Sequence, residues 1–212
     1  MRPALLFAAA FTAVGLLCPP AGASVIFAIK PATISAAAPS TGDIFDVVLT
    51  NTGPGSLLVD GFSFEISVTS ANITLTGANF STSDPYIFAA DSFDQINSLA
   101  LNTSSGQKLD ASDFTNDFAD ITINSGSTVG LGHIVFNVAS GTTPGLYPVT
   151  FTGGPNFNSL SNSTGGVAID QMVEANISVT GGATSAPEPE TGALVPLALA
   201  VLLGVFKMRR HG

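Results

Sequence analysis

Apolar and polar side chains alternate along several short segments of this chain, and this period of two limits the possible folds more than any other feature. In residues 62–69, Phe, Phe, Ile and Val alternate with Ser, Glu, Ser and Thr. Similar alternation occurs in residues 45–50, 73–75, 134–138, 149–151 and 177–179. A period of two places the apolar side chains on one face of a β-strand. Two sheets with such faces bury them against each other, so the pattern predicts a β-sandwich.

Turn-forming residues separate these segments. Gly, Pro and Asn cluster in residues 51–55, 141–145, 153–155 and 165–166, where they allow tight changes of chain direction. No apolar stripe at helical spacing occurs in residues 24–186. We therefore predict a single all-β domain. Residues 84–120 are less regular, and we expect them to form long loops with one short helical turn, followed by an edge strand near residues 121–123.

The N-terminus has the features of a secretory signal peptide. A basic residue, Arg2, precedes an apolar stretch, and Ala21 and Ala23 supply small side chains at a cleavage site. These features predict a signal peptide of residues 1–23. Lipid attachment at Cys18 is the alternative, but it requires a small residue before the cysteine, where this chain has leucine.

The C-terminus predicts a segment that stops in a membrane. Its three parts are the tripeptide Pro187, Glu188 and Pro189, then the apolar residues 192–206, then the basic Lys207, Arg209 and Arg210. The apolar part favours the bilayer, and the basic part stays on the cytoplasmic side. As a helix the apolar part would span only ~22 Å of a ~30 Å hydrocarbon core. It therefore suits a transient stop better than a permanent anchor.

This tail resembles the PEP-CTERM sorting signal of Gram-negative bacteria, over about one-eighth of the chain. The resemblance implies processing near the motif by an exosortase, with an association with exopolysaccharide and biofilm. It also implies transient anchoring in the inner membrane and then a cell-surface or extracellular location. An ordinary C-terminal anchor is the alternative. The predicted organisation is a signal peptide (1–23), a β-sandwich (24–180), a linker (181–190) and a sorting segment (191–212).

The order of the strand-like segments is similar to that of the cohesin-like jelly-roll sandwich. The matching segments are residues 43–47, 61–66, 132–138, 143–147 and 167–179. Cohesins bind dockerin modules through one sheet face. The resemblance implies the fold for this chain, but it carries over no binding residues.

Charge excludes one class of partner. Residues 24–186 contain 13 acidic residues but only two basic ones, Lys30 and Lys108, which gives a net charge of −11. Such a domain repels the phosphates of nucleic acids. The acids can attract divalent cations, or they can simply keep the protein soluble.

The sequence contains no convincing catalytic constellation. His133 is the only histidine in residues 24–186, and we expect it to be a surface or cross-strand residue. Two carboxylates suffice for glycoside hydrolysis, and Glu65, Asp91, Asp94 and Asp170 are candidates. However, the chain has no Trp and only two Tyr to form a sugar-stacking cleft.

A calcium loop is a second possibility for the acidic residues. Asp110, Asp113, Asp117 and Asp120 lie close together in the sequence. Their spacing does not match the EF-hand pattern, and no glycine lies between them to form the sharp turn. Solvated loop acids are the alternative that we favour.

These observations predict a non-enzymatic, exported surface or extracellular-matrix protein, structural or adhesive in exopolysaccharide or biofilm. Its expected partners are an exosortase-type enzyme, the membrane through the C-terminal segment, and exopolysaccharide or matrix proteins. No cofactor is expected. The first alternative is a carbohydrate- or protein-binding module with a defined ligand, and the second is a polysaccharide-active enzyme.

Overall fold

The computed structural model describes residues 24–94, 96–103 and 106–181 of the chain. This part contains fifteen β-strands, one short 3-10 helix and no α-helix. No helix within it is long and apolar enough to cross a membrane. The predicted signal peptide and sorting segment lie outside the described residues.

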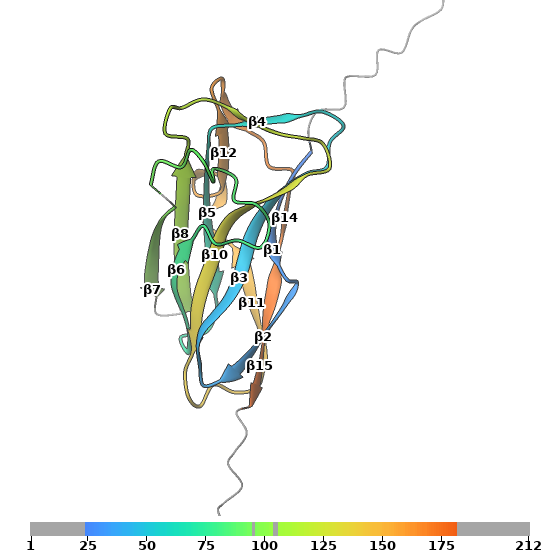
Figure 1. Cartoon of the computed structure of the whole chain (residues 1–212). Helices are drawn as coiled ribbons and strands as arrows, with labels where there is room; N and C mark the ends of the chain where they lie inside the picture. Colours follow the sequence, from blue (N-terminus) through green and yellow to red (C-terminus); the bar gives the residue numbers. More distant parts are fainter. Residues whose placement is uncertain (1–23, 95, 104–105, 182–212) are drawn as a thin grey trace, which may run out of the picture.

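Two sheets pack face to face as a sandwich (Figure 1). Sheet A has five strands in the order β14 (Gln171–Val173), β1 (Val25–Lys30), β3 (Ser40–Asn51), β10 (Thr128–Val138) and β6 (Ile73–Asn79). Sheet B has eight strands, and its main path is β13 (Gly165–Val167), β12 (Ser159–Asn162), β5 (Gly61–Val68), β11 (Gly145–Phe151), β15 (Ala175–Gly181) and β2 (Thr33–Ala38). On the other edge of β5 lie β8 (Gly106–Phe114) and then β7 (Asn97–Thr103).

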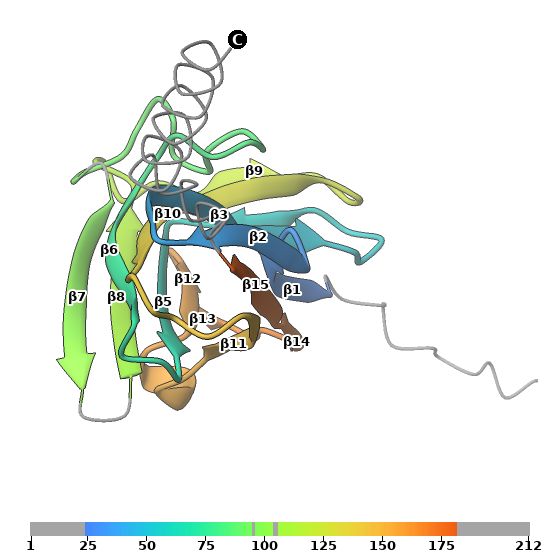
Figure 2. The ribbon, with the colours of Figure 1, turned by 90° about the horizontal axis from the view of Figure 1, so that it is seen from below.

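Strand β5 organises sheet B. Along one edge it pairs with β8 over its whole length. Along the other edge, its first half pairs with β12 and its second half with β11. The 3-10 helix η1 (Gly154–Asn156) connects β11 to β12. The view in Figure 2 shows β3 and β10 of sheet A in one layer and β11 and β12 of sheet B in the other.

The first strands connect the two sheets. The chain leaves β1 in sheet A at Pro31, forms β2 in sheet B, and returns to sheet A after Pro39. Proline has no N–H to continue a hydrogen-bonded ladder, so each proline separates strands of different sheets. β2 then pairs in parallel with the last strand, β15. The second strand and the last strand are therefore neighbours within one sheet.

The core lies between the sheets, where the sequence pattern predicted it. Phe62, Phe64, Ile66 and Val68 on β5 are all at most 4% exposed. From sheet A, they are matched by the buried Phe45, Val47, Leu49, Ile134 and Phe136. The predicted all-β sandwich is confirmed.

The outer face of sheet A is buried in one region, which alternation alone does not predict. Asp46 and Val48 point away from the core but are buried, because the segment after β6 crosses this face. Both backbone groups of Gly130 on β10 form hydrogen bonds with this segment. The Gly130 N–H donates to the Pro85 carbonyl oxygen at 2.8 Å, and the Gly130 oxygen accepts the Ile87 N–H at 2.9 Å. A Cβ at Gly130 would lie only 2.1 Å from the Thr82 hydroxyl oxygen, so the close approach requires glycine.

Residues 84–120 differ from the predicted long loops. They contain β7 and β8, which form an antiparallel hairpin on the edge of β5. Where one short helical turn was predicted, this region has consecutive turns over residues 87–91, with hydrogen bonds from the Ala89 N–H to the Tyr86 oxygen and from the Asp91 N–H to the Phe88 oxygen. The predicted edge strand is present as β9 (Ile121–Ile123), but it pairs with β4 (Leu57–Val59) in a separate two-stranded ribbon.

Candidate functional site

The outward side of sheet B around β5 carries a dense set of polar side chains, which we call the β5 face. Alternation along the strands turns these residues away from the core, and the register places them opposite one another. Three cross-strand pairs join β5 to β8: Ser63 with Ser112, Glu65 with Asp110, and Ser67 with Lys108. The other members are Asn97, Thr150, Thr152, Ser159 and the residues that follow η1, Phe157 and Asn158.

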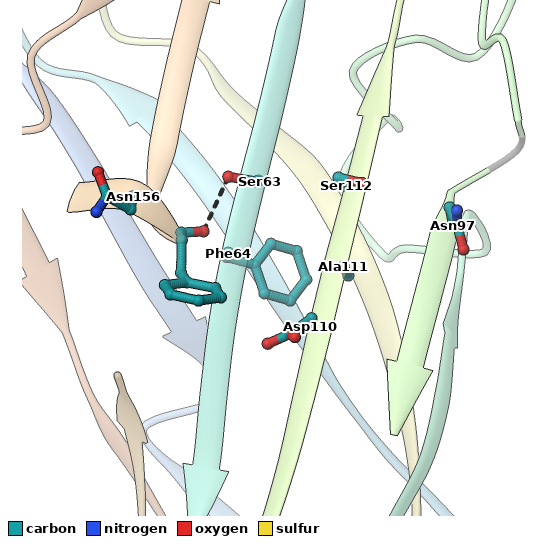
Figure 3. A pocket seen from close by; sticks show the side chains of 8 residues that line it. Ser63, Phe64, Asn97, Asp110, Ala111, Ser112 and Asn156 are labelled. Carbon is teal, nitrogen blue, oxygen red and sulfur yellow. Dashed lines mark hydrogen bonds between the residues drawn. The ribbon is translucent and has the colours of Figure 1, made fainter. Parts of the chain in front are cut away.

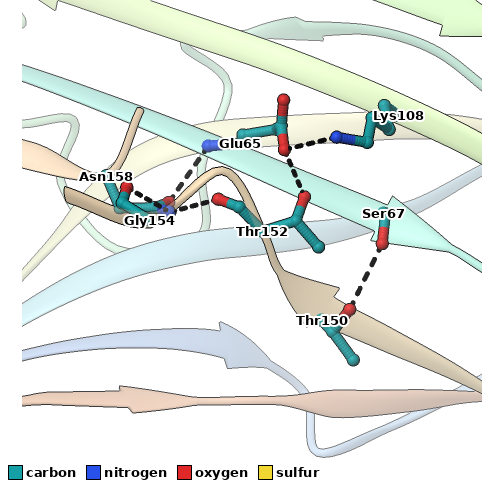
Figure 4. A network of polar contacts seen from close by, with 7 residues as sticks. All are labelled: Glu65, Ser67, Lys108, Thr150, Thr152, Gly154 and Asn158. Carbon is teal, nitrogen blue, oxygen red and sulfur yellow. Dashed lines mark hydrogen bonds and ion pairs between the residues drawn. The ribbon is translucent and has the colours of Figure 1, made fainter. Parts of the chain in front are cut away.

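A hydrogen-bond network fixes the centre of this face (Figure 4). The Glu65 carboxylate accepts hydrogen bonds from the Lys108 ammonium at 2.8 Å and from the Thr152 hydroxyl at 2.5 Å. Asn158 accepts a hydrogen bond from the Glu65 backbone N–H at 3.1 Å and donates one to the Thr152 carbonyl oxygen. The Glu65 side chain is only 5% exposed. A buried carboxylate with several fixed donors holds its position, so the face is preorganised.

Two carboxyl groups meet within this network. Burial alone would raise the pKa of Glu65, but the hydrogen bonds from Lys108 and Thr152 outweigh it and hold that pKa below its ordinary value. For Asp110, burial and then the neighbouring Glu65 carboxylate raise the pKa above its ordinary value. Oxygen Oδ1 of Asp110 is buried and has no hydrogen-bond partner within the described chain. Asp110 is therefore the carboxyl group of the pair that takes up a proton first.

Replacing Asp110 with asparagine is expected to stabilise the protein at neutral pH. The substitution removes a like charge directly opposite Glu65, which is worth up to about 1 kcal/mol in the free energy of unfolding. Because the pKa of Asp110 is raised in the folded state, the wild-type protein regains stability as the pH falls toward 3.8, the ordinary pKa of aspartate. The advantage of Asp110→Asn should therefore shrink as the pH falls from about 7 to about 4 in urea unfolding.

The matched control for this prediction is Asp94→Asn, at an exposed aspartate. It removes the same charge at a site without an opposed carboxylate on a paired strand. We expect its stability to stay within about 0.5 kcal/mol of the wild type. An Asp110→Asn variant that is less stable than the wild type at neutral pH would contradict the assignment of repulsion between the two carboxylates.

Beside the network lies a polar hollow (Figure 3). It has a volume of about 190 Å³ and is lined by Ser63, Asn97, Asp110, Ser112 and Phe157, among others. The Ser63 hydroxyl donates a hydrogen bond to the Phe157 carbonyl oxygen at 2.8 Å. The hollow therefore offers hydroxyl, amide and carboxyl groups together with one exposed ring.

The geometry does not suit glycoside hydrolysis. The carboxyl groups of Glu65 and Asp110 are close enough to share a hydrogen bond. Glycosidases hold their two carboxyl groups about 5–5.5 Å or about 6.5–9.5 Å apart, so that a sugar or a water fits between them. In addition, the Glu65 carboxylate is already engaged in an ion pair with Lys108 at 2.8 Å. The other predicted candidates are elsewhere: Asp170 accepts a hydrogen bond from the Val25 N–H, and Asp91 and Asp94 lie in the loop before β7.

His133 is a cross-strand residue, as predicted. It lies on β10 directly opposite Asp46 on β3, and its Nδ1 is 2.6 Å from the aspartate oxygen Oδ1. The two side chains are 15% and 8% exposed. The second oxygen of Asp46 accepts the N–H of Ser83 from the segment that crosses sheet A. The pair therefore helps to hold that segment on the sheet.

The four aspartates of the calcium hypothesis are not brought together. Asp110 belongs to the β5 face, whereas Asp113, three residues further along the strand, points inward and is 2% exposed. Asp117 lies beside Asp91, and Asp120 accepts hydrogen bonds from Ser163. Within the described ranges, no group of three or more His, Cys, Asp or Glu side chains could hold a metal ion.

The remaining predicted site residues lie outside the described residues and stay predictions. They are the cleavage residues Ala21 and Ala23, the sorting motif Pro187, Glu188 and Pro189, and the membrane stop Lys207, Arg209 and Arg210.

Comparison with known proteins identifies the fold. No protein-family model matches the chain, and no curated protein matches it. Solved structures of cohesins do match. The seventh ScaB type I cohesin of Pseudobacteroides cellulosolvens has 14% identity and a TM-score of 0.53, with coverage of 76% of this chain and 96% of the cohesin.

Two similar structures are complexes. One is a type I cohesin–dockerin complex from Clostridium thermocellum, and the other is the sixth cohesin of Acetivibrio cellulolyticus scaffoldin B with a Cel5 dockerin. Each has 14% identity and a TM-score of 0.53, with coverage of 74% of this chain and 99% of the matched chain. At this identity the likeness shows the fold alone, and the described part of the chain is a cohesin-like β-sandwich.

Proposed function

We propose that this chain is a non-enzymatic, exported surface or extracellular-matrix protein whose sandwich binds another protein through the β5 face. The observation that carries the proposal is that the β5 face is both held in place by hydrogen bonds and accessible. Its central side chains are held by the Glu65 network, while Ser112, Asn97 and Ser159 around them are exposed. A rigid and accessible sheet face can bind a partner without ordering itself first, which preserves affinity.

The chemistry of the face fits a protein partner. Two large apolar side chains are exposed on this side of the sheet, Leu146 at 66% and Phe157 at 46%. Hydroxyl and amide groups lie around Phe157 in the hollow, and protein interfaces combine apolar contacts with such a polar surround. A sugar-binding face relies on exposed aromatic platforms, and of the two rings that line the hollow only Phe157 is exposed, whereas Phe64 is 1% exposed. Solved structures of similar fold contain a cohesin bound to a dockerin, which supports protein binding as the use of this architecture.

The export part of the proposal rests on the two ends of the chain. The signal peptide would direct the sandwich across the inner membrane, and the PEP-CTERM-like tail would hold it there until an exosortase-type enzyme processes it. The protein would then reach the cell surface or the exopolysaccharide matrix. The intact mass of the extracellular form tests this: loss of the residues beyond about Pro189 supports sorting, and a C-terminus at Gly212 contradicts it.

Binding is tested with the mature protein and matched arginine substitutions. Proteins from the extracellular matrix of the source bacterium are captured and identified, and each is then purified and titrated against the wild type. Ser112→Arg and Ser159→Arg place a bulky charge on two exposed positions of the β5 face. Each should weaken binding at least about ten-fold.

The control is Ile44→Arg, because Ile44 is 51% exposed on the outer side of sheet A. It should leave the affinity unchanged. If Ile44→Arg abolishes binding and the two β5-face variants retain it, the proposed face is wrong. A glycan array run in parallel covers the alternative: saturable binding of one glycan, with no protein captured, would replace the proposal with carbohydrate binding.

A further inference from the structure

The phenyl rings of Phe93, Phe114 and Phe118 stack in a column at the end of β8. The rings of Phe93 and Phe118 are exposed. The ring centroids of Phe93 and Phe114 are 4.5 Å apart, and those of Phe114 and Phe118 are 5.4 Å apart, with interplanar angles of 19° and 17°. Phe93 is 50% exposed and Phe118 is 66% exposed. Burying such a side chain is worth about 1.5–3 kcal/mol, and exposed apolar patches of this kind mark interaction sites. We call these three residues the Phe column.

The backbone holds the Phe column in place. The Phe93 N–H donates a hydrogen bond to the Phe114 carbonyl oxygen at 3.0 Å. The Phe118 N–H donates one to the Thr115 carbonyl oxygen at 3.1 Å. Asp113 accepts the Phe114 N–H at 2.8 Å. Phe118 adopts a φ of 56°, a left-handed conformation that is unfavourable for a bulky residue and often found at functional positions. The rings are therefore presented by an ordered loop.

Two carboxyl groups lie beside the column. Asp91 is two residues before Phe93, Asp117 directly precedes Phe118, and a hydrogen bond from the Asn116 N–H to the Asp91 carbonyl oxygen joins their loops at 2.8 Å. Partial desolvation and then the neighbouring Asp117 carboxylate raise the pKa of Asp91. The two carboxyl groups are therefore close neighbours of like charge.

No cation within the described chain compensates this pair. The only two lysines of that part lie elsewhere: Lys108 binds Glu65 at 2.8 Å, and Lys30 lies 3.6 Å from Asp84. His133, its only histidine, pairs with Asp46. The acid pair therefore leaves a local negative charge beside exposed aromatic rings.

We propose that the Phe column and the acid pair of Asp91 and Asp117 form a docking surface for an arginine-bearing segment of a partner protein. A guanidinium group is planar and always charged, so it can bind carboxylates through paired hydrogen bonds and stack on a phenyl face. Phe118, at the exposed end of the column, offers that face. The surface goes beyond the β5 face, because it uses different residues and can be tested alone.

Other occupants fit this surface less well. Rings that bind a sugar chain lie side by side with free faces, whereas here the two faces of Phe114 are covered by its neighbours in the column. A second copy of this chain would bring another acid pair against the first, and like charges at short range repel. Phosphates and anionic lipids are repelled for the same reason.

The test is a titration of the mature protein with acetylated tri-arginine amide, followed by calorimetry and by NMR of the labelled protein. We expect saturable binding that weakens with added salt and shifts confined to residues 91–94 and 114–118. Phe118→Ala and Asp117→Asn should each weaken binding about two- to five-fold, the range expected for one exposed cation–π contact or one exposed charge pair. Both side chains are exposed, so the variants should keep the wild-type thermal unfolding.

Two matched controls make the result decisive. Glu174→Gln removes one exposed acid far from the column in sequence, and Phe157→Ala removes one exposed ring on the β5 face. Neither should change the affinity. Equal weakening by Glu174→Gln and Asp117→Asn would reduce the effect to net charge and overturn the proposal. Loss of binding in Phe157→Ala alone, or an oligosaccharide that binds and is lost in Phe118→Ala, would also overturn it.

Discussion

Asp113→Ala is expected to lower the free energy of unfolding by about 3–5 kcal/mol. The Asp113 side chain is 2% exposed and lies on the inner side of β8. It accepts hydrogen bonds from the hydroxyls of Tyr86 and Ser92, each at 2.5 Å, and from the Phe114 N–H at 2.8 Å. Alanine removes the acceptor that these groups share, and the buried Tyr86 hydroxyl left unsatisfied by itself costs about 1–3 kcal/mol. Urea unfolding with an unchanged m-value measures the loss.

A double-mutant cycle separates this cluster from a general effect of truncation. Tyr86→Phe removes only one donor and should cost about 1.5–3 kcal/mol, the value of a hydrogen bond to a charged group. Because the two residues share that bond, the double variant should lose less than the sum of the two single losses. The control is Asp120→Ala, at a partly exposed aspartate that bonds Ser163 at the surface. Equal losses for Asp113→Ala and Asp120→Ala would contradict a buried hub at Asp113.

The sandwich core could be predicted because its signal is local. In residues 62–68 every second side chain is a large apolar one, and all four of these side chains are buried against sheet A. A pattern with a period of two depends only on strand geometry, so it does not require knowledge of the distant partner.

The β7–β8 hairpin was not predicted because its inward side is partly polar. Along β8 the inward residues are Gln107, Leu109, Ala111 and Asp113, so two of the four positions resemble surface residues. Their burial depends on partners such as Tyr86, which follow from the tertiary structure. The available signal was the alternation of Leu109 and Ala111 with charged neighbours.

The β5 face could not be assembled from the sequence for a related reason. Glu65 meets Lys108, Thr152 and Asn158, which lie 43 to 93 residues away along the chain. Their contact depends on β8 and β11 flanking opposite edges of β5, and no local pattern specifies that order. Likewise, the burial of Val48 depends on the segment that crosses sheet A. An apolar residue at a position where alternation expects a polar one was the only trace of that cover.

Phe64→Ala is expected to destabilise the protein by about 3–5 kcal/mol, the usual range for a buried phenylalanine. Phe64 is 1% exposed, and its ring stacks on Phe62 with centroids 6.1 Å apart. Across the core, β10 carries Gly132, where a Cβ would lie 3.0 Å from the tip of the Phe64 ring. Since glycine has no side chain to move into the space, the cavity left by alanine should stay largely open. Phe157→Ala, at a half-exposed ring, should change the free energy of unfolding by far less.

Gly132→Ala tests the same contact from the opposite sheet. In the wild type the added methyl group presses on the Phe64 ring and on Ile96, and overpacking of this kind costs about 1–3 kcal/mol. In the Phe64→Ala background the same methyl group enters the cavity, so it should cost little or restore part of the lost stability. The two substitutions should therefore be coupled by about 1 kcal/mol or more in chemical denaturation. Strict additivity would mean that Phe64 does not fill the space over Gly132, and that the two sheets pack differently at this point of the core.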